Sequence, residues 1–210
     1  MATYTHPVTP AEISESILSI CRELSTVEAP CYIRVQPTIG AAINECFPIV
    51  TDRVATSGGA VVYGWSIREQ PKLFVEAEFH AVWRDKDGVL IDIAPKQRPT
   101  ERILFAVDSV KTFIGRQVGS VRRPLSRTPS VVEFINVLDE EFEFMNRGSR
   151  ASQQGDFGVR GHEATEYQDI QRRKTIHHLA MLKLSPEIWP YGPCACGSGK
   201  KVRWCHRSSN

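Results

Sequence analysis

The last twenty residues of the chain hold a group of side chains suited to binding a metal ion. Three cysteines and one histidine follow the spacing Cys-x-Cys-x8-Cys-His, and they are Cys194, Cys196, Cys205 and His206. Zn²⁺ in structural sites takes four tetrahedral ligands, and three thiolates with one imidazole form such a set. The residues between the cysteines are basic, and positive charge favours the thiolate form that binds metal. The spacing therefore predicts one structural zinc ion in the tail.

This tail resembles the SEC-C motif, a small zinc knuckle at the end of the bacterial protein-export motor and of many otherwise unrelated bacterial proteins. The resemblance covers residues 190–210, about a tenth of the chain. It implies a zinc site and a docking role for the tail. It does not name an activity for the rest of the protein.

A second set of residues could act as a nucleophile, a base and an orienting carboxylate. Cys46 precedes Pro48, which a helix tolerates only in its first turn, so we expect the cysteine at a helix N-terminus. The positive end of the helix dipole favours a thiolate there. His80 lies in a predicted strand, and the polar hairpin at 84–88 returns the chain so that Asp92 lies beside it. Cys46, His80 and Asp92 are therefore a candidate centre for nucleophilic catalysis.

The chain order of these three residues resembles that of the transglutaminase-like and papain-like cysteine enzymes, and the resemblance covers about residues 30–95. In that superfamily a cysteine opens a helix, and the histidine and aspartate lie on adjacent antiparallel strands. The resemblance implies a hydrolase or acyl transferase that acts on an amide. Cys46 would be the nucleophile, His80 the general base and acid, and Asp92 the orienting group. The backbone N–H of Cys46 and the side chain of Gln36 are the expected oxyanion donors.

Two other interpretations of these residues stay open. Buried cysteines are common in protein cores, and a strand histidine beside an aspartate can form a purely structural hydrogen bond. The chain would then be a non-enzymatic adaptor that binds protein or ribosome through its zinc tail. Alternatively, Glu76 and Glu78 share one face of a strand with His80 and could form a paired-carboxylate site with it.

Composition and charge narrow the class of protein. The chain is 41% hydrophobic and 24% charged, which is ordinary for a globular protein. No segment approaches the about eighteen apolar residues of a membrane-spanning helix, and the N-terminus lacks the features of a signal peptide. We therefore expect a cytoplasmic protein with no membrane partner, in which clustered cysteines bind metal rather than form disulfides.

The elements that must position the candidate residues are indicated by periodicity. Runs rich in β-branched and aromatic residues predict strands at 31–35, 60–67, 73–83, 89–93 and 103–107. Thr9 and Ser130 are expected to cap two helices, and a third helix is expected from about 44 to 57. A final helix carries apolar residues at Tyr167, Ile170, Ile176, Leu179 and Leu182.

These elements predict an α+β fold, a mainly antiparallel sheet with packed helices, followed by a helix and a small C-terminal zinc knuckle. The expected divisions are a cysteine-enzyme-like domain at 1–146, a linker at 147–162, a helix at 163–189 and the knuckle at 190–210. Residues 1–146 carry 15 Lys and Arg against 19 Asp and Glu, whereas 147–210 carry 11 against 5. We expect the basic tail to meet an acidic partner, a protein or ribosome, with nucleic acid less favoured.

Overall fold

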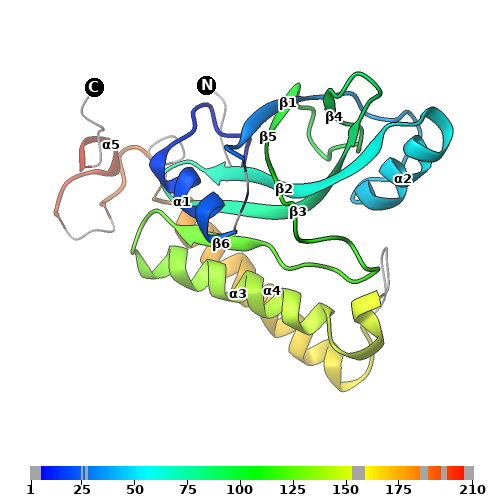
Figure 1. Cartoon of the computed structure of the whole chain (residues 1–210). Coiled ribbons are helices and arrows are strands. Elements are labelled where there is room, and N and C mark those ends of the chain that lie inside the picture. Colours follow the sequence, from blue (N-terminus) through cyan, green and yellow to red (C-terminus); the bar gives the residue numbers. More distant parts are fainter. Residues whose placement is uncertain are drawn as a thin grey trace. The chain divides into compact units, whose positions relative to one another are not determined.

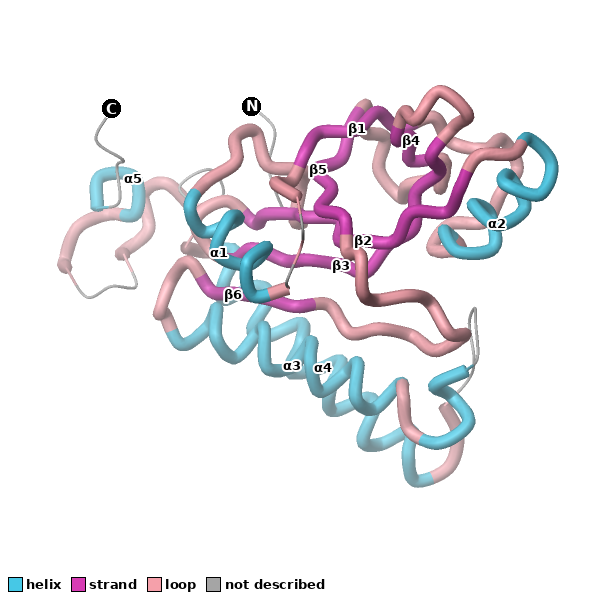
Figure 2. Tube along the Cα trace, viewed as in Figure 1, coloured by secondary structure: helices cyan, strands magenta, loops and turns pink. Residues whose placement is uncertain are grey.

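The strands predicted from the alternating pattern form a closed barrel in the computed structural model, which describes residues 6–24, 26, 28–152, 159–184, 189–194 and 198–205. The strands follow one another around the barrel in the order β2-β5-β1-β4-β3, and pairing of β2 with β3 closes it (Figure 2). They are β1 (Cys31–Val35), β2 (Ala60–Gln70), β3 (Phe74–Arg84), β4 (Leu90–Asp92) and β5 (Arg102–Val107). Four of them lie within one residue of the predicted ranges at both ends, and β2 extends three residues beyond its predicted end at 67.

The barrel sheet is mixed. β1 runs parallel to β4 and antiparallel to β5, whereas the β2–β5 and β3–β4 pairs are antiparallel. The predicted α+β class is confirmed because the chain contains both helices and this sheet. The mainly antiparallel sheet of the prediction is not confirmed.

The chain consists of two compact units. The barrel unit comprises Thr9–Arg68 and Glu76–Ile114, and the helical unit comprises Met1–Val8, Glu69–Val75 and Gly115–Asn210. The segment expected to be a linker includes a 3₁₀ helix, Gly148–Ser152.

The interior of the barrel is identified by one apolar cluster to which every strand contributes. Its members include Ile33, Val62, Val82, Leu90 and Phe105, one from each strand. Alternate side chains of a strand share a face, so residues an even number of positions from these also face inward. His80 and Asp92 therefore lie on the inner face of the barrel, two residues from Val82 and Leu90.

Two helices belong to the barrel unit, α1 (Glu15–Glu23) and α2 (Cys46–Ser57). The prediction that Thr9 caps the first helix is wrong, because Ser14 is the cap and its side chain accepts a hydrogen bond from Ile17 N–H. Thr9 instead donates its hydroxyl to the carbonyl of Arg102. The start of α2, in contrast, is as predicted, with Pro48 in its first turn.

The helical unit consists mainly of two long helices, α3 (Pro129–Met145) and α4 (His162–Leu182), which lie side by side (Figure 1). It also contains β6 (Val121–Pro124) and the short α5 (Val202–Cys205). Stacked rings of Phe144 and Tyr167 join the two long helices at one end, and ion pairs such as Arg173–Glu140 follow along them. No helix in the described part of the chain is long and apolar enough to cross a membrane.

Candidate active site

The structure places Cys46 at the first residue of α2. Asn44, two residues before it, has a positive φ of 66°, which turns the chain into the helix. The first N–H groups of a helix have no partner within it, so the Cys46 N–H is suited to receive a developing oxyanion. Gln36 is exposed, and its backbone N–H donates to the carbonyl of Asp92, so no contact of its side chain supports the expected oxyanion role.

The β3–β4 pairing brings His80 and Asp92 together. Trp83 is registered with Ile91, and continuing this antiparallel register places Asp92 opposite Val82, two residues from His80 on the same face. Diagonal neighbours on one face are within reach of long side chains. His80 Nε2 accordingly lies 3.1 Å from Asp92 Oδ1, and both side chains are buried.

Three groups surround the Asp92 carboxylate, which is fully buried. Oδ1 accepts a hydrogen bond from the Ala94 N–H at 3.1 Å in addition to its contact with His80. Oδ2 forms an ion pair with Lys96, whose Nζ lies 2.5 Å away. Burial acts to raise the pKa of Asp92, but the charges of His80 and Lys96 hold that pKa below its usual range. Asp92 is therefore an ionised carboxylate that carries two cationic partners.

His80 is held in its charged form and is linked to the thiol. Burial acts to lower the pKa of His80, but the Asp92 carboxylate and the hydrogen bonds to Asp92 and Cys46 raise that pKa to about 9. The imidazole is therefore protonated near neutral pH. The structure thus brings the three predicted residues Cys46, His80 and Asp92 into one hydrogen-bonded row.

An apolar and aromatic surrounding encloses the cysteine end of this row. Cys46 is 7% exposed and packs in a cluster with Val50 and Ile93. The next residue, Phe47, stacks on Phe113 with ring centroids 3.8 Å apart and an interplanar angle of 2°. Charges interact more strongly in such a low-dielectric environment than in water. The pairing of thiol, imidazole and carboxylate is thereby strengthened.

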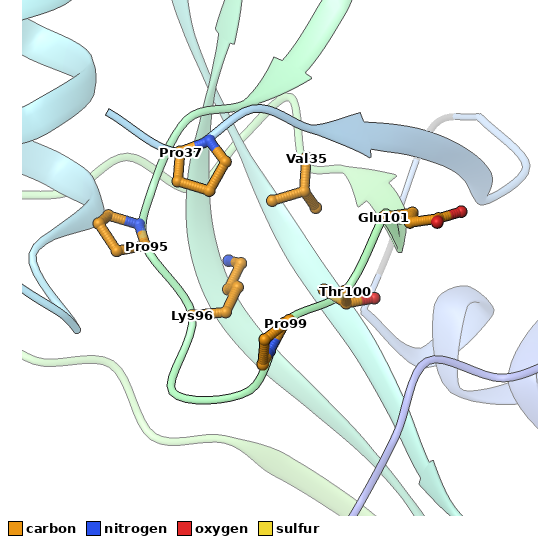
Figure 3. Close-up of a pocket in the computed structure, with 7 residues that line it drawn as sticks. All are labelled: Val35, Pro37, Pro95, Lys96, Pro99, Thr100 and Glu101. Atoms are coloured by element: carbon orange, nitrogen blue, oxygen red, sulfur yellow. The ribbon is translucent and has the colours of Figure 1, made fainter. Parts of the chain in front are cut away.

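The other end of the row meets a pocket of about 540 Å³. Figure 3 shows the Lys96 side chain projecting into the space bounded by the other lining residues, which are Val35, Pro37, Pro95, Pro99, Thr100 and Glu101. Lys96 Nζ also lies 3.2 Å from His80 Nε2. The pocket therefore reaches the centre at Lys96, on the carboxylate side of the imidazole.

Glu76 and Glu78 both form ion pairs with Arg68. Arg68 NH2 lies 2.7 Å from Glu76 Oε1 and 2.8 Å from Glu78 Oε2. One guanidinium thus bridges both carboxylates through charge-assisted contacts. Both carboxylates of the paired-carboxylate interpretation are therefore engaged by Arg68.

Two of the four expected zinc ligands belong to the described tail. Cys194 and Cys205 are not part of a disulfide, and Cys194 is buried. A β-bridge between Pro193 and Lys201 and a hydrogen bond from Cys194 N–H to the Lys200 carbonyl hold residues 193–194 beside residues 200–201. Cysteine sulfurs are among the ligands that Zn²⁺ prefers, so the chemistry of these two side chains fits the ion. Cys196 and His206 lie outside the described residues.

Sequence reasoning did not identify Lys96 as part of the centre. A spacing of four residues, as between Asp92 and Lys96, indicates an ion pair only within a helix. Here both residues lie at and beyond the end of β4, where the chain direction is set by tertiary structure.

Comparison with known proteins assigns no family. No protein-family model matches the chain, and neither curated proteins nor solved structures gave a significant match to it. Evidence for the function therefore comes from the site formed by Cys46, His80 and Asp92.

Proposed function

We propose that the barrel unit carries a cysteine-dependent hydrolase or acyl transferase that acts on an amide. The observation that supports the proposal is the hydrogen-bonded row Cys46–His80–Asp92 at the start of α2. It is the arrangement implied by the resemblance to the transglutaminase-like and papain-like cysteine enzymes. A nucleophile, a proton carrier and an orienting group are present in contact, as covalent catalysis requires.

Each residue has a defined role in the first half of the reaction. The Cys46 thiolate attacks the carbonyl carbon of the amide, and the carbonyl oxygen becomes an oxyanion beside the N-terminus of α2. When this intermediate collapses, the C–N bond breaks and the His80 imidazolium gives its proton to the leaving amine. Asp92 keeps the ring oriented and stabilises its charged form. The product of this half is a thioester on Cys46.

In the second half, His80 acts as a base. Water or an amine attacks the thioester and passes its proton to the neutral imidazole, and the C–S bond breaks to regenerate Cys46. Attack by water gives a carboxylic acid and makes the protein a hydrolase. Attack by an amine gives a new amide and makes it an acyl transferase.

An acyl-enzyme assay tests this proposal without knowledge of the substrate. A nitrophenyl ester should give a burst of nitrophenolate and leave one acyl group on Cys46, detected by peptide mass spectrometry. The Cys46→Ala variant should show no burst, whereas Cys31→Ala, which removes an exposed thiol, should keep it. A burst that survives Cys46→Ala would refute the proposed nucleophile.

One observation favours the second candidate, the non-enzymatic adaptor. Cys46 is 7% exposed and belongs to an apolar cluster, which is also how a structural cysteine is placed. In the adaptor the zinc tail performs the binding, and the row Cys46–His80–Asp92 serves only the stability of the barrel. The absence of an acyl-enzyme would favour this candidate.

We further propose that the tail binds one Zn²⁺ through Cys194, Cys196, Cys205 and His206. The fit of Cys194 and Cys205 and the Cys-x-Cys-x8-Cys-His spacing support it. When bound, the ion would supply structure rather than chemistry, since four protein ligands leave no open position for a reactant.

The surface of the tail supports a docking role. Tyr191 and Trp204 are about half exposed, and the ammonium group of Lys201 lies 5.8 Å and 5.6 Å from their ring centroids. Arg203 adds a second cation over Tyr191. A surface of aromatic rings and cations suits an acidic protein or ribosomal partner. The cytoplasm, as the compartment of such partners, is part of this proposal.

A further inference from the structure

We infer that Lys96 is a positioning residue of the proposed centre, which holds the Asp92 carboxylate so that His80 donates through Nε2 and presents Nδ1 to Cys46. This inference rests on the proposed function, because it assigns Lys96 a task only within the Cys46–His80–Asp92 row. Nothing in the sequence pattern pointed to Lys96, and the assignment comes from its contacts.

Both oxygens of the Asp92 carboxylate are in contact with neighbouring groups. Asp92 Oδ2 is taken by Lys96 Nζ at 2.5 Å, and Oδ1 by the Ala94 N–H at 3.1 Å and by His80 Nε2 at 3.1 Å. The Lys96 ammonium group therefore lies beside Oδ2, and a backbone N–H donates to Oδ1. The imidazole binds the same oxygen as the backbone N–H, and Lys96 balances the charge on the other oxygen.

The neighbours of His80 Nε2 indicate which ring nitrogen carries the proton. His80 Nε2 has two close neighbours, Asp92 Oδ1 at 3.1 Å and Lys96 Nζ at 3.2 Å. An ionised carboxylate only accepts hydrogen bonds, and an ammonium group only donates them. A lone pair on Nε2 would face the negative carboxylate, whereas an N–H there donates to it. The Lys96 ammonium group near Nε2 opposes an N–H there, but the effect of the Asp92 carboxylate is larger, so the arrangement with the proton on Nε2 is favoured.

The hydrogen bond with Cys46 indicates the role of the other ring nitrogen of His80. His80 makes a hydrogen bond with Cys46 as well as with Asp92. Since Nε2 is used by Asp92, Nδ1 is the nitrogen left for the thiol. The row then runs from the Cys46 sulfur to the His80 imidazolium, the Asp92 carboxylate and the Lys96 ammonium group.

The charge of Lys96 also has a consequence for the second half of the reaction. Burial and Lys96 both act to lower the pKa of His80, against Asp92 and Cys46, which raise it. A histidine that keeps its proton too firmly is a poor base when the thioester must be hydrolysed. Lys96 therefore orients the ring and also restrains the excess basicity that Asp92 imposes. Of the other charged groups of β3 on this face, Glu76 and Glu78 are neutralised in part by Arg68, and Arg84 is exposed at the end of the strand.

The pocket makes this role open to a direct test. The Lys96 side chain is 22% exposed and lines the cavity of about 540 Å³, which has room for a small alkylammonium ion. Lys96→Ala removes three methylene groups and the ammonium group, and propylammonium would replace those atoms. Lys96→Met removes the charge but keeps the space filled, so propylammonium should not act on it.

The experiment measures the pKa of the His80 ring by NMR, together with the pH dependence of Cys46 alkylation, in the full-length protein. In Lys96→Ala and in Lys96→Met, the His80 pKa should rise and the pH dependence of Cys46 alkylation should shift to higher pH. Propylammonium should return them toward the wild-type values in Lys96→Ala alone, and uncharged 1-propanol should not. Lys86→Met, in the exposed hairpin after β3, removes the same charge elsewhere and should leave both readouts unchanged.

Each outcome separates this inference from the proposed function. If wild-type Cys46 is reactive but the Lys96 variants keep the wild-type His80 pKa, the role of Lys96 is refuted and the proposed function stands. If Cys46 is unreactive in the wild-type protein, the proposed function fails first. If Lys96→Ala does not fold, Lys96→Met, which conserves volume, supplies the same comparison.

Discussion

His80 Nε2 lies 3.1 Å from Asp92 Oδ1, although the two residues are twelve positions apart and come from different strands. The β3–β4 hairpin creates this contact, because its antiparallel register puts both side chains on the inner face of the barrel. The pair is buried, so its charges interact across a poorly solvated space. The centre is therefore coupled to the stability of the barrel, and several consequences can be measured.

Asp92→Asn should destabilise the protein strongly. The substitution leaves His80 and Lys96 near each other without the carboxylate that holds them, and removing one partner of a buried ion pair costs about 3 kcal/mol or more. Urea unfolding gives this free energy. Glu15→Gln is the control, because Glu15 pairs with Arg22 where both side chains are exposed, and it should change stability by less than about 1 kcal/mol. Equal effects of the two substitutions would contradict the buried pairing.

The stability of the barrel should fall as pH rises above neutrality. The pKa of His80 in the folded protein, about 9, is above its ordinary value of 6.5. The contribution of His80 is therefore fully present below about pH 6.5 and is lost as pH rises through about 9. The free energy of unfolding of the wild-type protein should exceed that of His80→Gln by an amount that shrinks across this window. A difference that stays constant or grows with pH would show that His80 is not stabilised in its charged form.

Zinc content should depend on the tail cysteines. Purified protein should contain one zinc ion per chain by elemental analysis, and Cys196→Ser should lose it on dialysis, because a thiolate ligand is replaced by a weak one. Cys31→Ser, which changes a cysteine of β1, should retain the metal. Metal-free wild-type protein, or full occupancy in Cys196→Ser, would rule out the proposed ligand set.

The sequence pattern was most informative where a single physical constraint acted locally. Pro48 restricts the start of α2 and so located Cys46, and strand alternation placed His80 and Asp92 on one face. Prediction failed where tertiary contacts decide the outcome. Thr9 has the chemistry of a helix cap, but its hydroxyl is used by the Arg102 carbonyl, and the helix begins at Glu15 instead.

The buried face of α4 also differs from the apolar stripe that the sequence pattern predicted. The predicted apolar stripe included Ile176 and Leu179, yet these are 49% and 56% exposed. Ile170 is fully buried, whereas the same face also carries Lys174, which pairs with Glu141 of α3. A helix that packs partly through ion pairs does not show its buried face in hydrophobic periodicity alone. Lys96 was not predicted for a related reason, because its partners Asp92 and His80 come close to it only in the folded protein.

The most direct test of the account is the rate at which each cysteine reacts with iodoacetamide near pH 7, followed by peptide mass spectrometry. Burial raises the pKa of Cys21, and burial with the nearby Glu28 charge raises that of Cys31, so both should react slowly although Cys31 is exposed. Cys46 should react first, and His80→Gln should slow it by about tenfold or more, because the imidazolium that favours the thiolate is lost. If Cys46 reacts no faster than Cys21, or if its rate is the same in His80→Gln, the proposed catalytic centre is contradicted.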